Sequence, residues 1–193
     1  MKIAIVGYSG SGKSTLAKFL SEKLNLPVLY LDTVHWLPGW QERPKEETKA
    51  IVAKFLDENK GWVIDGSYGS VHYDRRMDEA DEILFLNFNR FTCLRRAFKR
   101  RKQYKGKNRF SMTEGCEERI SWEFFWWLIW EGRTKKRKQK FHLLQDKYQT
   151  KMLVIKNQRQ LDAFKSSIVD GLKKAEKEEM QSTAVIDEAK QID

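Results

Sequence analysis

The chain has 193 residues and a net charge of +10, with 40% apolar and 12% aromatic residues. These values are typical of a globular chain of one domain and exclude an intrinsically disordered one. The two cysteines, Cys93 and Cys116, lie in no metal-ligand spacing and indicate no disulfide framework. The N-terminus has too short an apolar stretch for a signal peptide. We therefore expect a cytoplasmic protein.

Five short apolar runs alternate with longer amphipathic stretches and are predicted to be β-strands. They span residues 2–6, 27–31, 62–65, 82–87 and 151–156. Strands that alternate with helices predict right-handed βαβ units, and nearly uniform apolar runs predict a parallel sheet that is covered on both faces. We expect a single domain over residues 1–175, followed by a polar tail over 176–193 that is disordered or helical.

The positive charge is concentrated in two runs. Residues 90–109 hold ten Lys or Arg and residues 133–140 hold six, and neither run contains an acid. Such a concentration attracts polyanions, which are either nucleic acid or the phosphates of a nucleotide. Both runs lie between the fourth and fifth predicted strands, so this region is expected to form a helical basic lid with an insertion at about residues 100–140.

The densest apolar window is ISWEFFWWLIW, over residues 120–130. It is too short to cross a bilayer, which needs about 20 apolar residues. We expect a buried or lid-packing helix here and no membrane partner. A helix that lies on a membrane surface, followed by the basic run RTKKRKQK, is the less favoured alternative.

The strongest motif is GYSGSGKS at residues 7–14, which matches GxxxxGK[ST] at every fixed position. It follows a predicted strand and precedes a helical pattern, which is the context of a phosphate-binding P-loop. Backbone N–H groups of such a loop surround phosphate oxygens, and the helix that begins there adds its N-terminal dipole. Lys13 is expected to reach the β and γ phosphates of ATP, and Ser14 to ligate Mg²⁺. The predicted nucleotide-binding residues are Gly7, Tyr8, Ser9, Gly10, Ser11, Gly12, Lys13, Ser14 and Thr15.

The remaining motifs favour a small kinase among P-loop proteins. The guanine-reading NKxD motif and the LSGGQ signature of ABC ATPases are absent from the sequence. In small kinases an acid at the end of a second core strand assists Mg²⁺, and Asp65 in WVIDG stands at that position. The alternative for Asp65 is a turn-forming Asp-Gly pair.

Several segments together resemble the DNA topology modulation (FlaR-related) protein family. They are GYSGSGKSTLAKFL, LDTVHWLPGWQERP, GWVIDGSYG, NRFTCLRRAFKRR, WEGRTKKR and KNQRQLDAF. The resemblance covers roughly residues 1–170. It implies an adenylate-kinase-like P-loop NTPase, with a five-stranded parallel sheet sandwiched by helices and a lid. It implies no particular reaction.

Asp32 ends the second predicted strand and is the candidate for the acceptor side. In small-molecule kinases with a similar layout, such as shikimate kinase, an acid at this position holds a substrate hydroxyl. Asp32 is therefore a candidate general base or substrate-orienting group, and helix capping is an equally weighted alternative. His35, Trp36 and Trp40 follow closely and are candidates to line the acceptor pocket.

Arginines are the expected partners of anionic groups. In adenylate kinase an Arg follows the Asp-Gly turn within two residues and holds the acceptor phosphate, whereas this chain continues with SYG. The next arginines, Arg75 and Arg76, are the candidate substitutes, and this departure argues against phosphorylation of AMP.

Lid arginines are expected to neutralise the transferring phosphoryl group. Two pairs with a spacing of four residues each share one helix face, and they are Arg96 with Arg100 and Arg133 with Arg137. Asn157 and Arg159, in the loop after the fifth strand, are candidate contacts of the adenine base.

Two functions from different classes remain. The first is an ATP- and Mg²⁺-dependent kinase that acts on a small-molecule or nucleotide acceptor. The second is an ATP-dependent nucleic-acid-binding protein that influences DNA topology or gene regulation. The absence of a helix-turn-helix, zinc finger or repeated stacking motif weighs against the second.

Overall fold

A computed structural model describes residues 1–117 and 121–190, in two compact units that divide between Lys156 and Asn157. The first unit contains a five-stranded parallel sheet with the strand order β2-β5-β1-β6-β7. Its strands are β1 (Lys2–Gly7), β2 (Val28–Tyr30), β5 (Trp62–Asp65), β6 (Glu82–Leu86) and β7 (Met152–Ile155). The predicted α/β fold with a five-stranded parallel sheet is confirmed. Two short strands, β3 (Trp36–Leu37) and β4 (Gln41–Glu42), form a separate antiparallel pair.

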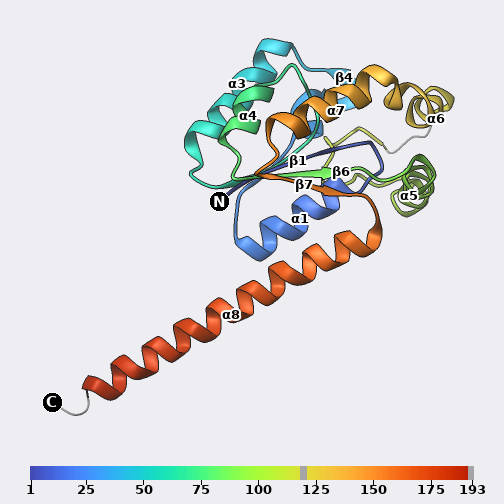
Figure 1. Cartoon of the computed structure of the whole chain (residues 1–193). Coiled ribbons are helices and arrows are strands. Elements are labelled where there is room, and N and C mark those ends of the chain that lie inside the picture. Colours follow the sequence, from blue (N-terminus) through green and yellow to red (C-terminus); the bar gives the residue numbers. More distant parts are fainter. Residues whose placement is uncertain (118–120, 191–193) are drawn as a thin grey trace. The chain divides into compact units, whose positions relative to one another are not determined.

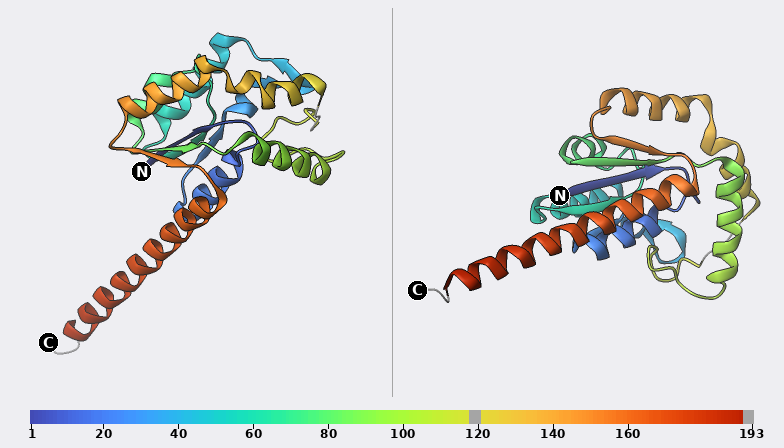
Figure 2. Two further views of the ribbon diagram at one scale, coloured as in Figure 1. Left: turned by 45° about the vertical axis from the view of Figure 1, so that its right-hand side comes forward. Right: turned by 60° about the horizontal axis from the view of Figure 1, so that its bottom comes forward.

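Helices cover both faces of the sheet. Helices α3, α4 and α7 lie on one face and α1 lies on the other (Figure 1, and the left view of Figure 2). The helices of this unit are α1 (Lys13–Leu24), α2 (Leu31–His35), α3 (Lys45–Glu58), α4 (Tyr73–Glu79), α5 (Arg90–Gln103), α6 (Trp122–Ile129) and α7 (Lys135–Lys147), with the 3₁₀ turns η1 (Pro38–Trp40) and η2 (Glu131–Arg133). Because both faces are covered, the central strand β1 is apolar and buried from Ile3 to Val6, as expected for a parallel sheet.

The register of the sheet brings three chain segments to one edge. Asp65, the last residue of β5, pairs with Ile5 of β1 on one side and with Tyr30 of β2 on the other. The P-loop follows β1, and Asp32 follows β2. In open α/β sheets ligands bind outside the carboxyl ends of the strands, so this edge is where a site is expected.

The region between β6 and β7 contains α5, α6, η2 and α7; the predicted insertion at about residues 100–140 stays a prediction. The apolar window was predicted to form a buried or lid-packing helix; it forms the helix α6, which contacts α5, but most of its indoles are not buried. Within α6 only Leu128 is buried, whereas Trp122 and Trp126 are exposed, as is Trp130 directly after it. Residues 118–120 lie outside the described residues.

The second unit consists of Asn157–Asp193, and its described residues contain the helix α8 (Gln158–Lys190). The side-chain oxygen of Asn157 accepts a hydrogen bond from the backbone N–H of Gln160 and so caps the first turn. The predicted boundary after residue 175 falls inside α8, which continues past it as a helix. Among the described residues, no helix combines the length and apolar content that a bilayer crossing requires.

Arg76 lies in α4 and is buried against the loop that follows β5. Its guanidinium donates hydrogen bonds to the backbone carbonyl oxygens of Val71 (2.9 Å), Gly66 (3.2 Å) and Tyr68 (2.6 Å). Burial lowers the pKa of Arg76 to about 10, because the surroundings disfavour its charge. Its neighbour Arg75 pairs instead with Glu79 and Asp57 on the surface. These contacts do not support the prediction that Arg75 and Arg76 clamp an acceptor phosphate, because carbonyls and carboxylates already occupy both guanidinium groups.

We expect Arg76→Met to destabilise the protein by about 3 kcal/mol or more, because three carbonyl oxygens, two of them in buried hydrogen bonds, lose their donor. Arg75→Gln is the matched control and should cost less than about 1 kcal/mol, since it removes surface ion pairs. The free energy of unfolding from urea titration measures both changes. Equal, small losses in the two variants would contradict the structural role of Arg76.

Candidate functional site

The P-loop runs from the end of β1 to the first turn of α1 and lies against neighbouring backbone. A Cβ atom on Gly10 would lie 2.5 Å from the carbonyl oxygen of Cys93, and one on Gly7 would lie 2.6 Å from that of Leu86. Both glycines also have positive φ angles, of +73° and +144°. The loop can therefore follow this path only with glycine at these two positions.

Lys13 makes a hydrogen bond within the P-loop, and Ser14 makes one to the last residue of β5. The ammonium group of Lys13 donates to the carbonyl oxygen of Tyr8 across the loop, at 3.2 Å. The hydroxyl of Ser14 donates to Oδ2 of Asp65 at 2.6 Å. Tyr8 itself packs edge-on against Phe141 of α7. Ser9 lies in the loop and Thr15 in the first turn of α1, where its side chain is exposed.

Asp65 is a buried carboxylate, and only one of its two oxygens accepts a hydrogen bond within the described part of the chain. Its Oδ1 atom is buried and has no hydrogen-bond partner within the described part of the chain. Burial raises the pKa of Asp65 above its usual value, and the charge of Lys13 opposes this change, while Asp32 reinforces it. A buried carboxylate oxygen without a partner is unfavourable unless a ligand or cation binds there.

The oxygen atoms around Asp65 fit Mg²⁺ as a ligand set. Mg²⁺ is bound by one or two carboxylates together with substrate phosphates and waters, rather than by an all-protein cage. Ser14 and Asp65 supply a hydroxyl and a carboxylate in contact with each other. No cluster of three or more His, Cys, Asp or Glu residues suited to a metal occurs among residues 1–117 and 121–190. The Ser14 hydroxyl and the Asp65 carboxylate are the kind of ligands that a protein supplies to a Mg²⁺ ion bound together with phosphates.

Asp32 is held by two side chains that the sequence analysis did not identify. Its Oδ1 atom accepts a hydrogen bond from the hydroxyl of Tyr68 at 2.8 Å, and its Oδ2 atom lies 3.4 Å from the guanidinium of the buried Arg109. Burial raises the pKa of the Tyr68 hydroxyl, and the negative charge of Asp32 raises it further. Tyr68 therefore remains protonated and can keep donating to Asp32.

The capping alternative for Asp32 is not supported. No side chain caps the N-terminus of α2, and the Asp32 carboxylate is directed to Tyr68 and Arg109. Arg109 lies in the first basic run and Tyr68 in the SYG segment after the Asp-Gly turn. A contact between residues so far apart in the chain has no signal in a single sequence.

The segment from Arg109 to Cys116 lies against the residues that follow Asp32. The hydroxyl of Thr113 donates to the carbonyl oxygens of Thr33 and Trp36, and the N–H of Gly39 donates to the carbonyl of Gly115 at 3.2 Å. This acceptor-side segment, residues 109–116, thus forms one side of the region around Asp32.

The aromatic candidates lie beside the same carboxylate. The His35 ring is 4.7 Å from both the Trp36 and the Tyr68 ring, and Trp36 is 5.5 Å from Trp40. His35 also lies 3.8 Å from the carboxylate of Glu42. These residues are positioned to border an acceptor, although their role stays a prediction.

Two of the four predicted lid arginines contact the P-loop region. Arg96 donates to the carbonyl oxygen of Ser11 and stacks over the ring of Phe88 at 4.1 Å. Arg133 stacks over the ring of Tyr8 at 3.9 Å and donates to the carbonyl oxygen of Phe88 at 2.7 Å.

The other candidates lie elsewhere. Arg100 is half-buried one turn beyond Arg96 on α5, and Arg137 stacks over Trp127 at 5.4 Å. Asn157 and Arg159 belong to the second unit, so their predicted contact with adenine stays a prediction.

Comparison with known proteins gives one matching family model and a set of solved structures with a similar fold. A family model described as an AAA domain matches residues 3–119, which is more than half of the chain. Comparison with curated protein sequences gives no significant match.

The solved structures that are similar include kinases. Deoxyadenosine kinase from M. mycoides, with the products dCMP and a flexible dCDP bound, has 18% identity and a TM-score of 0.50, over 90% of this chain and 100% of that one. The same enzyme with bound dATP has 18% identity and a TM-score of 0.50, over 87% and 99%. Shikimate kinase from Bacteroides thetaiotaomicron has 17% identity and a TM-score of 0.50, over 90% and 98%. At these identities the likeness establishes the P-loop α/β fold.

We expect Asp65→Asn to abolish stabilisation by Mg²⁺ with ATP but not to lower the melting temperature of the free protein. The pKa of Asp65 is raised, so its ionised form at neutral pH costs folding free energy, and this cost disappears as pH falls through that pKa. Asparagine carries no such cost. Ligand at about 100 times its Kd should add about 2.7 kcal/mol to the wild type.

Thermal unfolding with and without Mg²⁺ and ATP measures both effects, with Asp170→Asn on α8 as the control. A strongly destabilised free Asp65→Asn protein, or one that still responds fully to Mg²⁺, would argue against this account.

Proposed function

The chain belongs to the AAA domain family, and we propose that it is a small P-loop kinase that transfers the γ-phosphoryl group of ATP, with Mg²⁺, to a small-molecule or nucleotide acceptor. The observation that carries the proposal is the carboxylate of Asp32. Tyr68 and Arg109 hold it at the same sheet edge as the P-loop and Asp65. A carboxylate held in this position can orient and deprotonate an acceptor hydroxyl, which phosphate binding alone does not require.

The donor side of the reaction is assigned to the P-loop. Its backbone N–H groups and Lys13 bind the phosphates, and Ser14 and Asp65 hold the cation. Mg²⁺ supplies positive charge that neutralises the phosphoryl group as it moves. Arg96 and Arg133, which contact Ser11 and Tyr8 of the loop, add further positive charge beside it.

The acceptor side of the reaction is assigned to Asp32. A hydroxyl group that donates to its carboxylate is oriented for attack on the γ-phosphorus, and Asp32 can accept the proton as the new P–O bond forms. Tyr68 and Arg109 fix the orientation of the carboxylate. The dATP-bound kinase with the same fold supports a nucleoside triphosphate as the donor. Both kinases named above support a hydroxyl-bearing acceptor, whose identity is left open.

The deciding experiment measures acceptor-dependent ADP release. The wild type is incubated with Mg-ATP and a panel of nucleosides, nucleotides and small alcohols, and Lys13→Ala is the control that removes phosphate binding. One acceptor should stimulate ADP release in the wild type alone. The absence of any stimulation, together with tight DNA binding that weakens steeply with salt, would favour the nucleic-acid-binding alternative instead.

Asp32→Asn is expected to lower kcat about 10²- to 10⁴-fold, which is the range for a lost general base, while ATP affinity is unchanged. ADP release with the stimulating acceptor gives kcat, and ATP titration gives the affinity. Retention of full activity would return Asp32 to a purely structural role.

Arg109→Gln is expected to lower kcat/KM for the acceptor roughly 10- to 100-fold, the equivalent of one charged hydrogen bond. Arg101→Gln, an exposed arginine of the same basic run, should leave it unchanged. If both substitutions had the same effect, the basic run would act through its total charge and not through the contact with Asp32.

A further inference from the structure

An aromatic surface outside the kinase site is the strongest feature that the proposed function leaves unexplained. Trp122, Trp126 and Trp130 follow each other at intervals of four residues and are 72%, 47% and 62% exposed. Phe91 and Phe98 are seven residues apart on α5 and are 72% and 46% exposed. We call these five side chains the aromatic face. Helices α5 and α6 contact each other, so the two sets of exposed rings belong to neighbouring elements.

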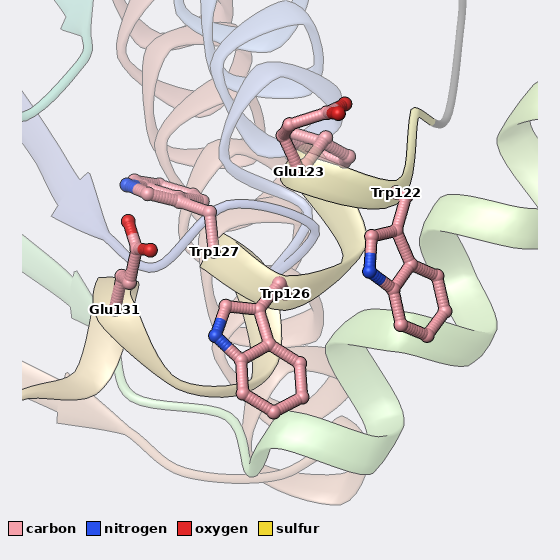
Figure 3. A pocket seen from close by; sticks show the side chains of 6 residues that line it. Trp122, Glu123, Trp126, Trp127 and Glu131 are labelled. Atoms are coloured by element: carbon pink, nitrogen blue, oxygen red, sulfur yellow. The ribbon is translucent and has the colours of Figure 1, made fainter.

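Figure 3 shows that the indoles of α6 point to different sides of the helix. Trp122 and Trp126 point away from Trp127 and Glu131, which lie on the other side of the helix. The pocket drawn there is lined by residues of α6 and η2 and includes none from the P-loop or around Asp32. Three large indoles in contact with solvent are unfavourable unless a partner covers them.

Basic side chains are interleaved with the aromatic face. Arg95, Lys99 and Lys102 are exposed and share the side of α5 that carries Phe91 and Phe98, because they are spaced by three, four or seven residues. Within residues 1–117 and 121–190, no acidic side chain forms an ion pair with any of the three. The partner should therefore combine apolar material with negative charge.

A second copy of this chain does not fit that description. It would bring Arg95, Lys99 and Lys102 of one copy close to the same residues of the other, and like charges across an interface are costly.

Single-stranded nucleic acid fits less well than a lipid surface. Bases bind by stacking on free ring faces in a basic groove. Here the rings face one another: Trp122 and Phe125 are 5.2 Å apart with planes at 15°, and Trp126 and Trp130 are 6.3 Å apart at 19°. The exposed indoles therefore offer few free ring faces for bases to stack on.

We propose that the aromatic face docks the protein on a membrane surface that contains anionic lipids. Indole side chains are favoured at the boundary between headgroups and acyl chains, and neighbouring Lys and Arg are attracted to anionic headgroups. Helix α6 would lie on the membrane and not cross it. This reverses the preference drawn from the sequence, in which a buried or lid-packing helix was favoured over a membrane-surface helix.

The experiment uses the full chain and vesicles of phosphatidylcholine alone or with one third phosphatidylserine. Sedimentation should give binding to the anionic vesicles only, with a shift of tryptophan emission to shorter wavelength. Replacing Trp122, Trp126 and Trp130 together by Ala should abolish both signals. Leu143→Ala, which removes another exposed apolar side chain, should preserve both.

A second variant tests the charges separately. Replacing Arg95, Lys99 and Lys102 together by Gln should weaken vesicle binding about fivefold for each charge removed. The matched control replaces Lys173, Lys174 and Lys177 of α8 by Gln, removes the same charge and should bind normally. Melting temperature and ATP binding of every variant should equal those of the wild type, since none of these residues belongs to the kinase site.

Three results would overturn the proposal. The first is equal binding to both kinds of vesicle, or binding to neither. The second is tryptophan-dependent binding of a labelled oligothymidine without binding to vesicles, and the third is a dimer, measured by light scattering, that becomes a monomer when the three tryptophans are replaced. The proposal does not depend on the kinase activity, so its failure leaves that function untouched.

Discussion

The candidate site depends on the parallel register that places Asp65 between Ile5 and Tyr30. Because the carboxyl ends of parallel strands meet at one edge, this pairing determines how far the P-loop, Asp65 and Asp32 lie from each other. A change in the pairing of β5 would separate Ser14 from Asp65 and remove the only neutral donor that the Asp65 carboxylate receives in the described residues. The buried apolar strands therefore set the geometry of the charged site, and Arg76 fixes the loop that carries Tyr68.

The charged groups at this edge have opposing effects on the pKa of Asp65, which burial raises. Asp32 raises the pKa of Asp65, whereas Lys13 and Arg109 lower it. Two carboxylates so placed would repel each other without those cations. Their separate partners, Ser14 for Asp65 and Tyr68 with Arg109 for Asp32, give them distinct environments and allow different roles. This difference is the physical basis for assigning one to the cation and the other to the acceptor.

Local patterns in the sequence were enough to predict the fold and to indicate the P-loop and Asp65, whose roles toward ATP and Mg²⁺ stay predictions. The P-loop is a contiguous motif, and the strands are apolar runs whose order of appearance dictates a parallel sheet. The acceptor half depends on contacts across the chain, such as Tyr68 and Arg109 with Asp32, which no spacing reveals. For Arg76 the sequence indicated a phosphate contact that the structure does not support. A charged residue near a turn resembles a phosphate ligand until its burial and its carbonyl partners are known.

The basic run of residues 90–109 illustrates why composition alone could not decide between functions. As one block of charge it indicated a polyanion partner, but α5 distributes its side chains around a helix. Arg96 is directed to Ser11 of the P-loop, whereas Arg95, Lys99 and Lys102 lie on the exposed side with Phe91 and Phe98. One charged segment can therefore serve phosphate chemistry on one face and an anionic partner on the other. A lid explains the first set of charges and does not explain the second, because exposed aromatic rings contribute nothing to phosphate binding.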